Sequence, residues 1–126
     1  MIGQKSMTEK TDSKPYDLEE RTIKYARDVF AFVGLCPKTL VNNELVKQVI
    51  RSAGSVGANY IEARESLGKK DQTMRIRICR KEVKESRYWL QLFETKGEDL
   101  ENKRQKLINE SSELLKIFTA IIEKIK

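Results

Sequence analysis

The chain has 126 residues, of which 39% are hydrophobic, so it can bury the core of one domain without a metal ion or a disulfide. Lysine and arginine outnumber aspartate and glutamate by 25 to 19, and this net charge of +6 permits an acidic partner without requiring one. The sequence contains no histidine, which excludes Ser-His and Cys-His nucleophiles and the Glu-x-x-His ligands of di-iron bundles.

The sequence predicts a cytoplasmic protein that does not associate with membranes. No apolar run reaches the roughly 18 residues that a membrane span needs, and no signal peptide is visible. Cys36 and Cys79 are the two cysteines, and we expect both to be free, buried or half-buried thiols in a reducing compartment. Residues 1–14 are polar and unpatterned, which predicts a disordered tail before a domain over residues 15–126.

The first predicted helix begins at the stretch YDLEER. Asp17 is the expected N-cap, and Glu20, three residues later, can close a capping box. Apolar residues then recur every three or four positions, which is the period of a helix with one buried face. The helix is expected to end before Pro37, since proline disfavours helical geometry in the residue before it.

The second predicted helix begins near Asn42 or Asn43, both good N-caps, and ends before Gly68, the expected C′ residue. Its middle, residues 52–58, reads SAGSVGA and carries only small side chains. Glycine inside a helix costs about 1 kcal/mol relative to alanine. We therefore expect a bulky face, with Trp89 as the best candidate, to pack closely on this segment and offset that cost. The alternative is that the helix merely tolerates these glycines.

The third predicted helix runs from about residue 71 to residue 94 and has an apolar, a mixed and a basic face. The basic face carries Lys70, Arg77, Arg80, Lys81, Lys84 and Arg87. An ion pair of Arg51 with Glu82 or Glu85 would satisfy charges partly buried between the second and third helices. The predicted structural polar cluster comprises Arg51, Ser55, Asn59, Glu82, Glu85 and Trp89.

The fourth predicted helix follows the turn KGED and carries two apolar rows at seven-residue spacing, a pattern typical of helix bundles. The rows are Leu107, Leu114 and Ile121, and Ile108, Leu115 and Ile122, with Phe118 and Ile125 extending the seam. No alternating strand pattern occurs, and short connections favour antiparallel neighbours. The sequence therefore predicts an all-α fold, an antiparallel up-down-up-down four-helix bundle.

Two stretches, LVKQVIRSAGSVGANYIEARE and KKDQTMRIRICRKEVKESRYWLQL, resemble a bacterial four-helix-bundle family. This family includes proteins encoded in intervening sequences of 23S ribosomal RNA genes and, distantly, the accessory variability determinants of diversity-generating retroelements. The resemblance covers residues 16–126, and its most specific part is the run at residues 51–59. It implies a homopentamer of bundles with no catalytic residues. The retroelement relatives bind nucleic acid and a reverse transcriptase through a basic surface.

Three functions are compatible with these patterns. The first is a non-enzymatic oligomer that binds RNA or DNA through the basic face, as a ribonucleoprotein or reverse-transcriptase accessory factor with no cofactor and no metal. The second is a structural or adaptor oligomer with a protein partner. It is suggested by large apolar residues beyond one seam: Phe30, Phe32, Phe118 and Ile122. The third is a magnesium-dependent nucleotide pyrophosphohydrolase. Its carboxylates would be Glu62, Glu65, Glu82 and Glu85.

Overall fold

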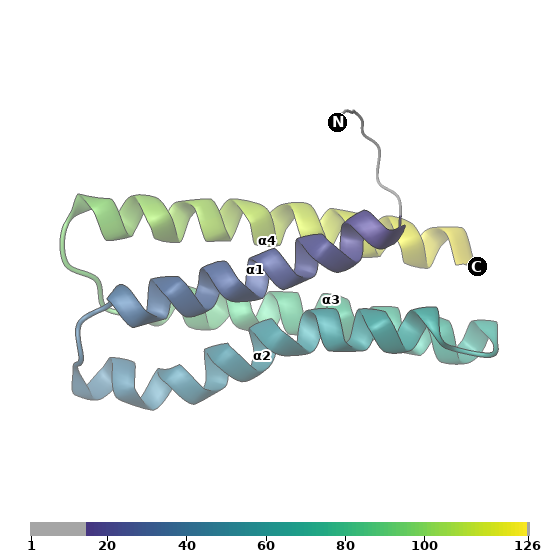
Figure 1. Cartoon of the computed structure of the whole chain (residues 1–126), viewed down its shortest axis with the longest axis horizontal. Helices are drawn as coiled ribbons and strands as arrows, with labels where there is room; N and C mark the ends of the chain where they lie inside the picture. The colour runs from purple at the N-terminus through teal and green to yellow at the C-terminus, as the bar shows by residue number, and fades with distance from the viewer. Residues whose placement is uncertain (1–14, 126) are drawn as a thin grey trace.

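A computed structural model describes residues 15–125 as four α-helices that run in alternating directions (Figure 1). The helices are α1 (Pro15–Leu35), α2 (Leu40–Arg64), α3 (Lys69–Leu92) and α4 (Glu98–Ile125). α1 and α3 occupy opposite corners of the bundle, and each packs against α2 and α4. The α2–α3 contact is the most extensive. The predicted all-α four-helix bundle is confirmed, while the predicted tail, residues 1–14, lies outside the described residues.

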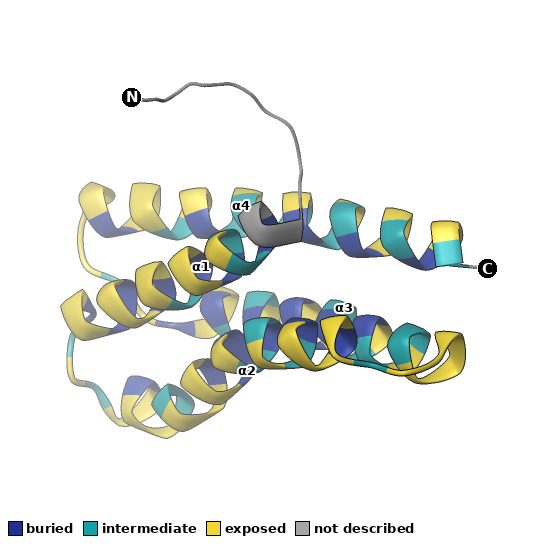
Figure 2. Ribbon diagram, turned by 45° about the vertical axis from the view of Figure 1, so that its right-hand side comes forward, coloured by how far each residue is buried: buried dark blue, intermediate teal, exposed yellow. Residues whose placement is uncertain are grey.

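Each helix buries one face in a common core (Figure 2). α2 and α3 meet through small and β-branched side chains, which allow close contact. Fully buried members of this contact are Val49, Ala53, Val56, Cys79 and Val83. The predicted seam of α4 is confirmed, since Leu114, Phe118 and Ile122 are buried and the second row packs against the core. Both cysteines are buried free thiols, as predicted.

Two buried hydroxyl groups connect the diagonal helices α1 and α3 through the core. Tyr25 Oη lies 2.7 Å from Ser86 Oγ, and the Ser86 hydroxyl lies 3.0 Å from the carbonyl oxygen of Val83. Because a serine hydroxyl has one proton and donates it to Val83, the Tyr25 hydroxyl donates to Ser86. Burial raises the pKa of Tyr25 to about 12, so this phenol remains a neutral donor.

The start of α2 differs from the prediction, because Thr39 rather than Asn42 or Asn43 is the N-cap. The Thr39 hydroxyl accepts a hydrogen bond from the Asn42 backbone N–H at 3.0 Å. The Asn42 side chain instead donates to the carbonyl oxygens of Pro37 and Glu94, both at 2.9 Å, and accepts from the Glu94 N–H at 2.8 Å. Asn42 therefore joins the α1–α2 and α3–α4 connections, which lie at the same end of the bundle (Figure 1).

Two further helix ends were predicted wrongly. α1 begins at Pro15, which suits a first helical turn because proline has a fixed φ and no N–H, so Asp17 lies within the helix instead of capping it. Gly68 is not the C′ residue of α2, because α2 ends at Arg64 and its C-cap is Glu65. Gly68 is the N-cap of α3, in an extended conformation with φ −141° and ψ 164°.

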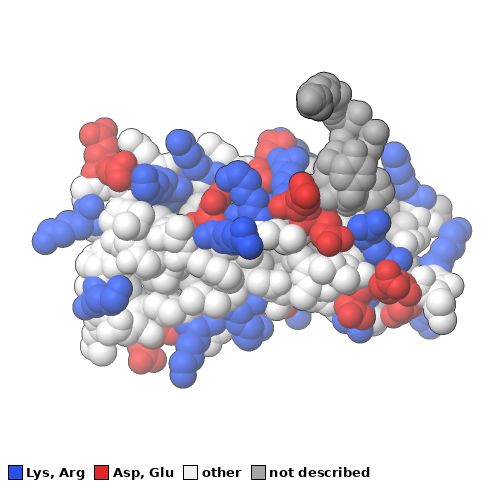
Figure 3. Space-filling model, viewed as in Figure 1, with Lys and Arg blue, Asp and Glu red and all other residues white. Residues whose placement is uncertain are grey.

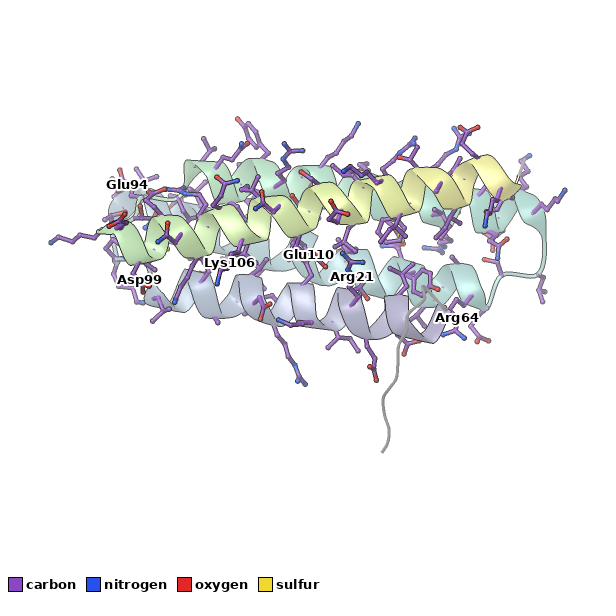
Figure 4. The ribbon with its side chains drawn as sticks, turned by 90° about the horizontal axis from the view of Figure 1, so that it is seen from above. Arg21, Arg64, Glu94, Asp99, Lys106 and Glu110 are labelled. Carbon is purple, nitrogen blue, oxygen red and sulfur yellow. The ribbon has the colours of Figure 1, made fainter. Side chains whose placement is uncertain are left out.

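Two arginines attach neighbouring elements to α4. Arg21 on α1 donates to both carboxylate oxygens of Glu110, at 2.7 and 2.9 Å, and the two side chains point toward one another in Figure 4. This pair is partly exposed, so it orients α1 on α4 more than it stabilises the fold. Arg104 donates to the carbonyl oxygens of Leu90 and Phe93, at 2.8 and 2.7 Å, and thereby caps the C-terminal end of α3.

Gly57 lies at a close approach of α1 to α2. A Cβ atom at Gly57 would lie 2.8 Å from Thr22 Oγ1 and 3.3 Å from Thr22 Cβ, whereas a Cβ atom at Gly54 would meet nothing within 4 Å. The expected close packing is therefore present at Gly57, but its partner is α1. The expectation that Trp89 packs on these glycines is wrong, because helical periodicity identifies the low surface without identifying which helix covers it.

We predict opposite effects for alanine at the two glycines. Gly54→Ala should raise the free energy of unfolding by about 0.5–1 kcal/mol, because alanine favours helix and the site is open. Gly57→Ala should lower it by about 1–3 kcal/mol, because Thr22 is buried and cannot move away freely. Urea denaturation followed by circular dichroism measures both changes. Stabilisation by Gly57→Ala would contradict the close approach, and Thr22→Ala should relieve the damage if the approach is correct.

Candidate functional site

The six predicted basic-face residues lie on the side of α3 that faces away from the core. Four of them are exposed, and Arg80 and Arg87 are half-buried. Arg80 Nη1 lies 3.5 Å from Thr119 Oγ1, so this side chain reaches toward α4. The structure thus places these cations on one helix surface, and their role in binding stays a prediction.

Part of the basic face belongs to a straight row along α3. Six residues of α3 follow one another at intervals of four or three positions, and we call them the outer row: Lys70, Met74, Arg77, Lys81, Lys84 and Tyr88. Such spacing places successive side chains on one line, which is about 27 Å long at 1.5 Å per residue. All six are exposed, and none carries a carboxylate. The row is therefore a continuous cationic surface with an apolar residue near one end and a tyrosine at the other.

A groove of about 690 Å³ lies at the end of the bundle where α3 begins and α4 ends. Three apolar side chains, from Met74, Ile78 and Ile125, line it. Every charged side chain in the lining is basic: Lys69, Lys70, Arg77 and Lys81. The sequence analysis did not predict this groove. Met74 and Ile78, which lie four residues apart between basic residues, are the feature of the sequence that could have indicated it. The groove combines an apolar lining with a positive rim.

The polar residues that were predicted to cluster between α2 and α3 make two separate groups of contacts. In the first, Arg51 Nη2 lies 3.6 Å from Glu85 Oε2, so Glu85 is the partner rather than Glu82. In the second, the Asn59 amide donates to the Ser55 carbonyl oxygen at 2.9 Å. Arg75 donates to Asn59 Oδ1 at 3.1 Å. Sequence reasoning did not assign Arg75 to the cluster, because it lies at the boundary between two helix faces.

Glu82 and Trp89 are the other two predicted members of the cluster. Glu82 is only 7% exposed. Among the described residues, neither Glu82 Oε1 nor Trp89 Nε1 has a hydrogen-bond partner, although both atoms are buried. Burial raises the pKa of Glu82, and the hydrogen bond and negative charge of Glu85 act in the same direction. The Glu82 carboxylate is therefore an unfavourable charge in the folded protein at neutral pH.

We predict that Glu82→Gln stabilises the protein at pH 7. Because the pKa of Glu82 is raised on folding, the folded protein binds this proton more tightly than the unfolded chain does. Stability from this group is thus present at acid pH and is lost as the pH rises above about 4.3, the ordinary glutamate value. Thermal unfolding should show a higher midpoint for the variant at pH 7 and a smaller difference at pH 4.5. Glu62→Gln, at an exposed position of α2, is the matched control. An equal change in the unfolding midpoint of both variants would refute the claim that the buried charge of Glu82 destabilises the folded protein.

Exposed apolar residues gather where α1 and α2 meet. Ile23 and Phe30 on α1 are 44% and 40% exposed, and Ile50 and Ile61 on α2 are 38% and 43% exposed. The contacts of Gly57 with Thr22 and of Arg64 with Glu19, at 2.9 Å, set the antiparallel register. This register places Ile61 near the level of Ile23 and Ile50 near the level of Phe30. We call these four residues the α1–α2 apolar face, and Figure 3 shows an uncharged band along this side of the molecule.

The apolar surplus predicted for the first and fourth helices is largely wrong. Only Phe30 is exposed, while Phe32, Phe118 and Ile122 are at most 2% exposed and belong to the core. A bundle of four helices needs large residues on more than one seam of each helix, because each helix contacts two neighbours. The exposed large apolar residues lie instead on α1, α2 and α3 and at Leu67 in the α2–α3 turn.

The carboxylates considered for magnesium do not form a site. Glu62 and Glu65 are exposed on α2, whereas Glu82 is buried on α3. Within residues 15–125, no group of three or more His, Cys, Asp or Glu side chains is arranged to hold a metal ion. No helix in this part of the chain is long and apolar enough to cross a membrane.

The fold places this chain in the class of small antiparallel four-helix-bundle proteins, and α3 carries a row of exposed cations. The sequence model of the 23S rRNA-intervening sequence protein family matches residues 15–120, and the chain belongs to this family. A crystal structure of a protein with unknown function from the S23 ribosomal protein family of Bacteroides thetaiotaomicron is similar. It has a TM-score of 0.71 and 27% identity, covering 88% of this chain and 99% of that chain. A comparison with curated proteins gives no match. The family resemblance identified in the sequence is confirmed.

Proposed function

We propose that this protein is a non-enzymatic, homo-oligomeric bundle that binds nucleic acid through the basic face of α3 in the cytoplasm. The observation that carries the proposal is the outer row, in which cations follow one another along α3 without an intervening carboxylate. Each lysine or arginine that contacts a phosphate releases a counterion, so such a row adds affinity with every contact. Of the three carboxylates of α3, Glu82 is buried and Glu85 pairs with Arg51, so Asp71 in the first turn alone is exposed beside the row.

RNA is the first partner to test. The names of the family and of the similar structure refer to ribosomal RNA and to a ribosomal protein family, which favours RNA. The resemblance to retroelement accessory proteins extends the proposal to DNA and to a reverse transcriptase as a protein partner. In each case the bundle would act as a ribonucleoprotein or accessory factor that presents cations on a rigid helix.

In the proposed assembly, copies of the chain associate through the α1–α2 apolar face. An exposed apolar surface of this kind commonly marks an interface. It lies on the α1–α2 side of the bundle, whereas the groove and Arg80 lie on the α3–α4 side. A ring of five copies, the assembly that the family resemblance implies, would therefore keep its basic faces accessible and multiply their charge.

We predict that reversing two charges of the basic face strongly weakens RNA binding. In fluorescence anisotropy with labelled RNA, the Arg80→Glu/Lys84→Glu variant should lose at least tenfold in affinity, and the slope of log affinity against log salt should become shallower. Lys47→Glu, on exposed α2, changes one charge outside the basic face and provides the control. Equal affinities of the double variant and the wild type, or wild-type binding that does not respond to salt, would refute the proposal.

We predict that Ile61→Lys disrupts the oligomer. A lysine in the α1–α2 apolar face would place a charge in the proposed interface. Charged residues are rare at the centres of protein interfaces, so this charge should oppose association. Light scattering after size-exclusion chromatography should show a multiple of 14.6 kDa for the wild type and a monomer for the variant. Leu67→Lys, at a fully exposed leucine outside this face, should retain the wild-type mass. An Ile61→Lys variant with the wild-type mass would place the interface elsewhere.

A structural or adaptor function with a foreign protein partner is the second candidate. The same α1–α2 apolar face favours it, because a monomeric wild type would leave about 40% of each of these four side chains exposed without an internal explanation. A monomeric mass at micromolar concentration, together with no RNA binding, would favour this candidate over the first.

A further inference from the structure

We infer that the groove at the start of α3 takes unpaired nucleotides, so that the preferred ligand is single-stranded nucleic acid rather than a duplex. This inference rests on the proposed nucleic-acid function and assigns it a ligand class. It depends on the lining of the groove and on the residue at the far end of the outer row.

The groove lining suits a ligand in which an apolar group lies close to a negatively charged group. Met74, Ile78 and Ile125 provide apolar contact, and the cations beside them can contact phosphates. In a duplex the flat faces of the bases are stacked inside, and only the sugar–phosphate backbone and the groove edges are presented to a helix surface. Unpaired bases expose their faces, which can pack on apolar side chains and on the polarisable sulfur of methionine.

The outer row leads from the groove to an aromatic side chain. Tyr88 is 55% exposed, and its ring packs edge-on against Trp89 with 5.1 Å between ring centroids. Trp89 packs against the core, so it holds the tyrosine ring in place while the ring keeps an open side. A positioned, exposed tyrosine is a common stacking platform for single-stranded bases.

The length of the row matches a short single strand. Lys70 and Tyr88 are about 27 Å apart along the helix axis. At the helical rise of about 3.4 Å per nucleotide this span corresponds to about eight nucleotides, and to fewer when the strand is extended. Arg77, Lys81 and Lys84 lie between the two ends and would contact the intervening phosphates. An acidic peptide could use the same cations, but it would not require an aromatic platform at the end of the row.

The test compares one labelled 16-nucleotide RNA, alone and annealed to its complement, by fluorescence anisotropy. The wild type should bind the single strand at least tenfold more tightly than the duplex. Met74→Ser and Tyr88→Ala should each weaken single-strand binding about tenfold, in line with base stacking, and leave duplex binding unchanged. Neither variant removes a charge, so the salt dependence of binding should stay that of the wild type. Both positions are exposed, and circular dichroism verifies that the variants fold.

Controls separate this inference from the function on which it rests. Leu40→Ser makes a similar apolar-to-polar change at an exposed residue of α2 and should have no effect. The inference would be overturned, and the proposed function would stand, if three results were found together. Duplex and single strand would bind equally well, Met74→Ser and Tyr88→Ala would not change the affinity, and Arg77→Glu/Lys81→Glu would bind much more weakly. Failure of the wild type to bind any of the RNAs would overturn both. Displacement of the RNA by a glutamate- and leucine-rich peptide at tenfold lower concentration than by unlabelled RNA would also overturn the inference.

Discussion

The packing of α2 on α3 decides where the functional side chains of α3 point. Small residues on both helices allow the two backbones to approach, and Cys79 Sγ lies 3.3 Å from the Val56 carbonyl oxygen as a result. Once this buried face is set, the helical repeat of 3.6 residues turns Glu82 inward and the outer row outward. Substitutions within the α2–α3 contact would therefore rotate or displace the cationic surface without touching it.

The sequence was sufficient for the fold class because the apolar residues of every helix repeat at helical spacing and no competing strand pattern exists. The spacing along α2 and α3 also predicted an ion pair of Arg51 with α3, and left open whether its partner is Glu82 or Glu85. Asn42 was predicted to be an N-cap because its side chain can accept a hydrogen bond from a backbone N–H. It does accept such a bond, but from Glu94, which lies 52 residues away in the sequence and whose position the local sequence does not reveal.

Other features depend on which helices are neighbours, which periodicity does not encode. The low surface at Gly57 was recognised, but Thr22 rather than Trp89 covers it. The α1–α2 apolar face was missed because Ile50 and Ile61 lie at the edge of an otherwise buried arc, and their exposure follows only from the position of α1. Likewise, the groove requires the C-terminal end of α4 beside the start of α3, a contact between residues more than 40 positions apart.

The arrangement of surfaces explains how one small bundle can combine assembly with binding. The α1–α2 apolar face and the groove belong to opposite sides of the molecule, so neighbouring copies could cover the first without covering the second. Charge is divided in the same manner, since the paired ions Arg21–Glu110 and Arg64–Glu19 lie on α1 and its contacts, whereas the outer row on α3 retains its positive charge.

The side chain of Asn42 has a mechanical consequence for this bundle. Its three hydrogen bonds join two chain reversals at one end, so neither reversal can loosen without releasing the other. The opposite end contains the α2–α3 turn with its fully exposed Leu67 and the last turn of α4. Thermal fraying should therefore start at the end that holds the groove, where the walls can shift to admit ligands of different width while the clamped end preserves helix register.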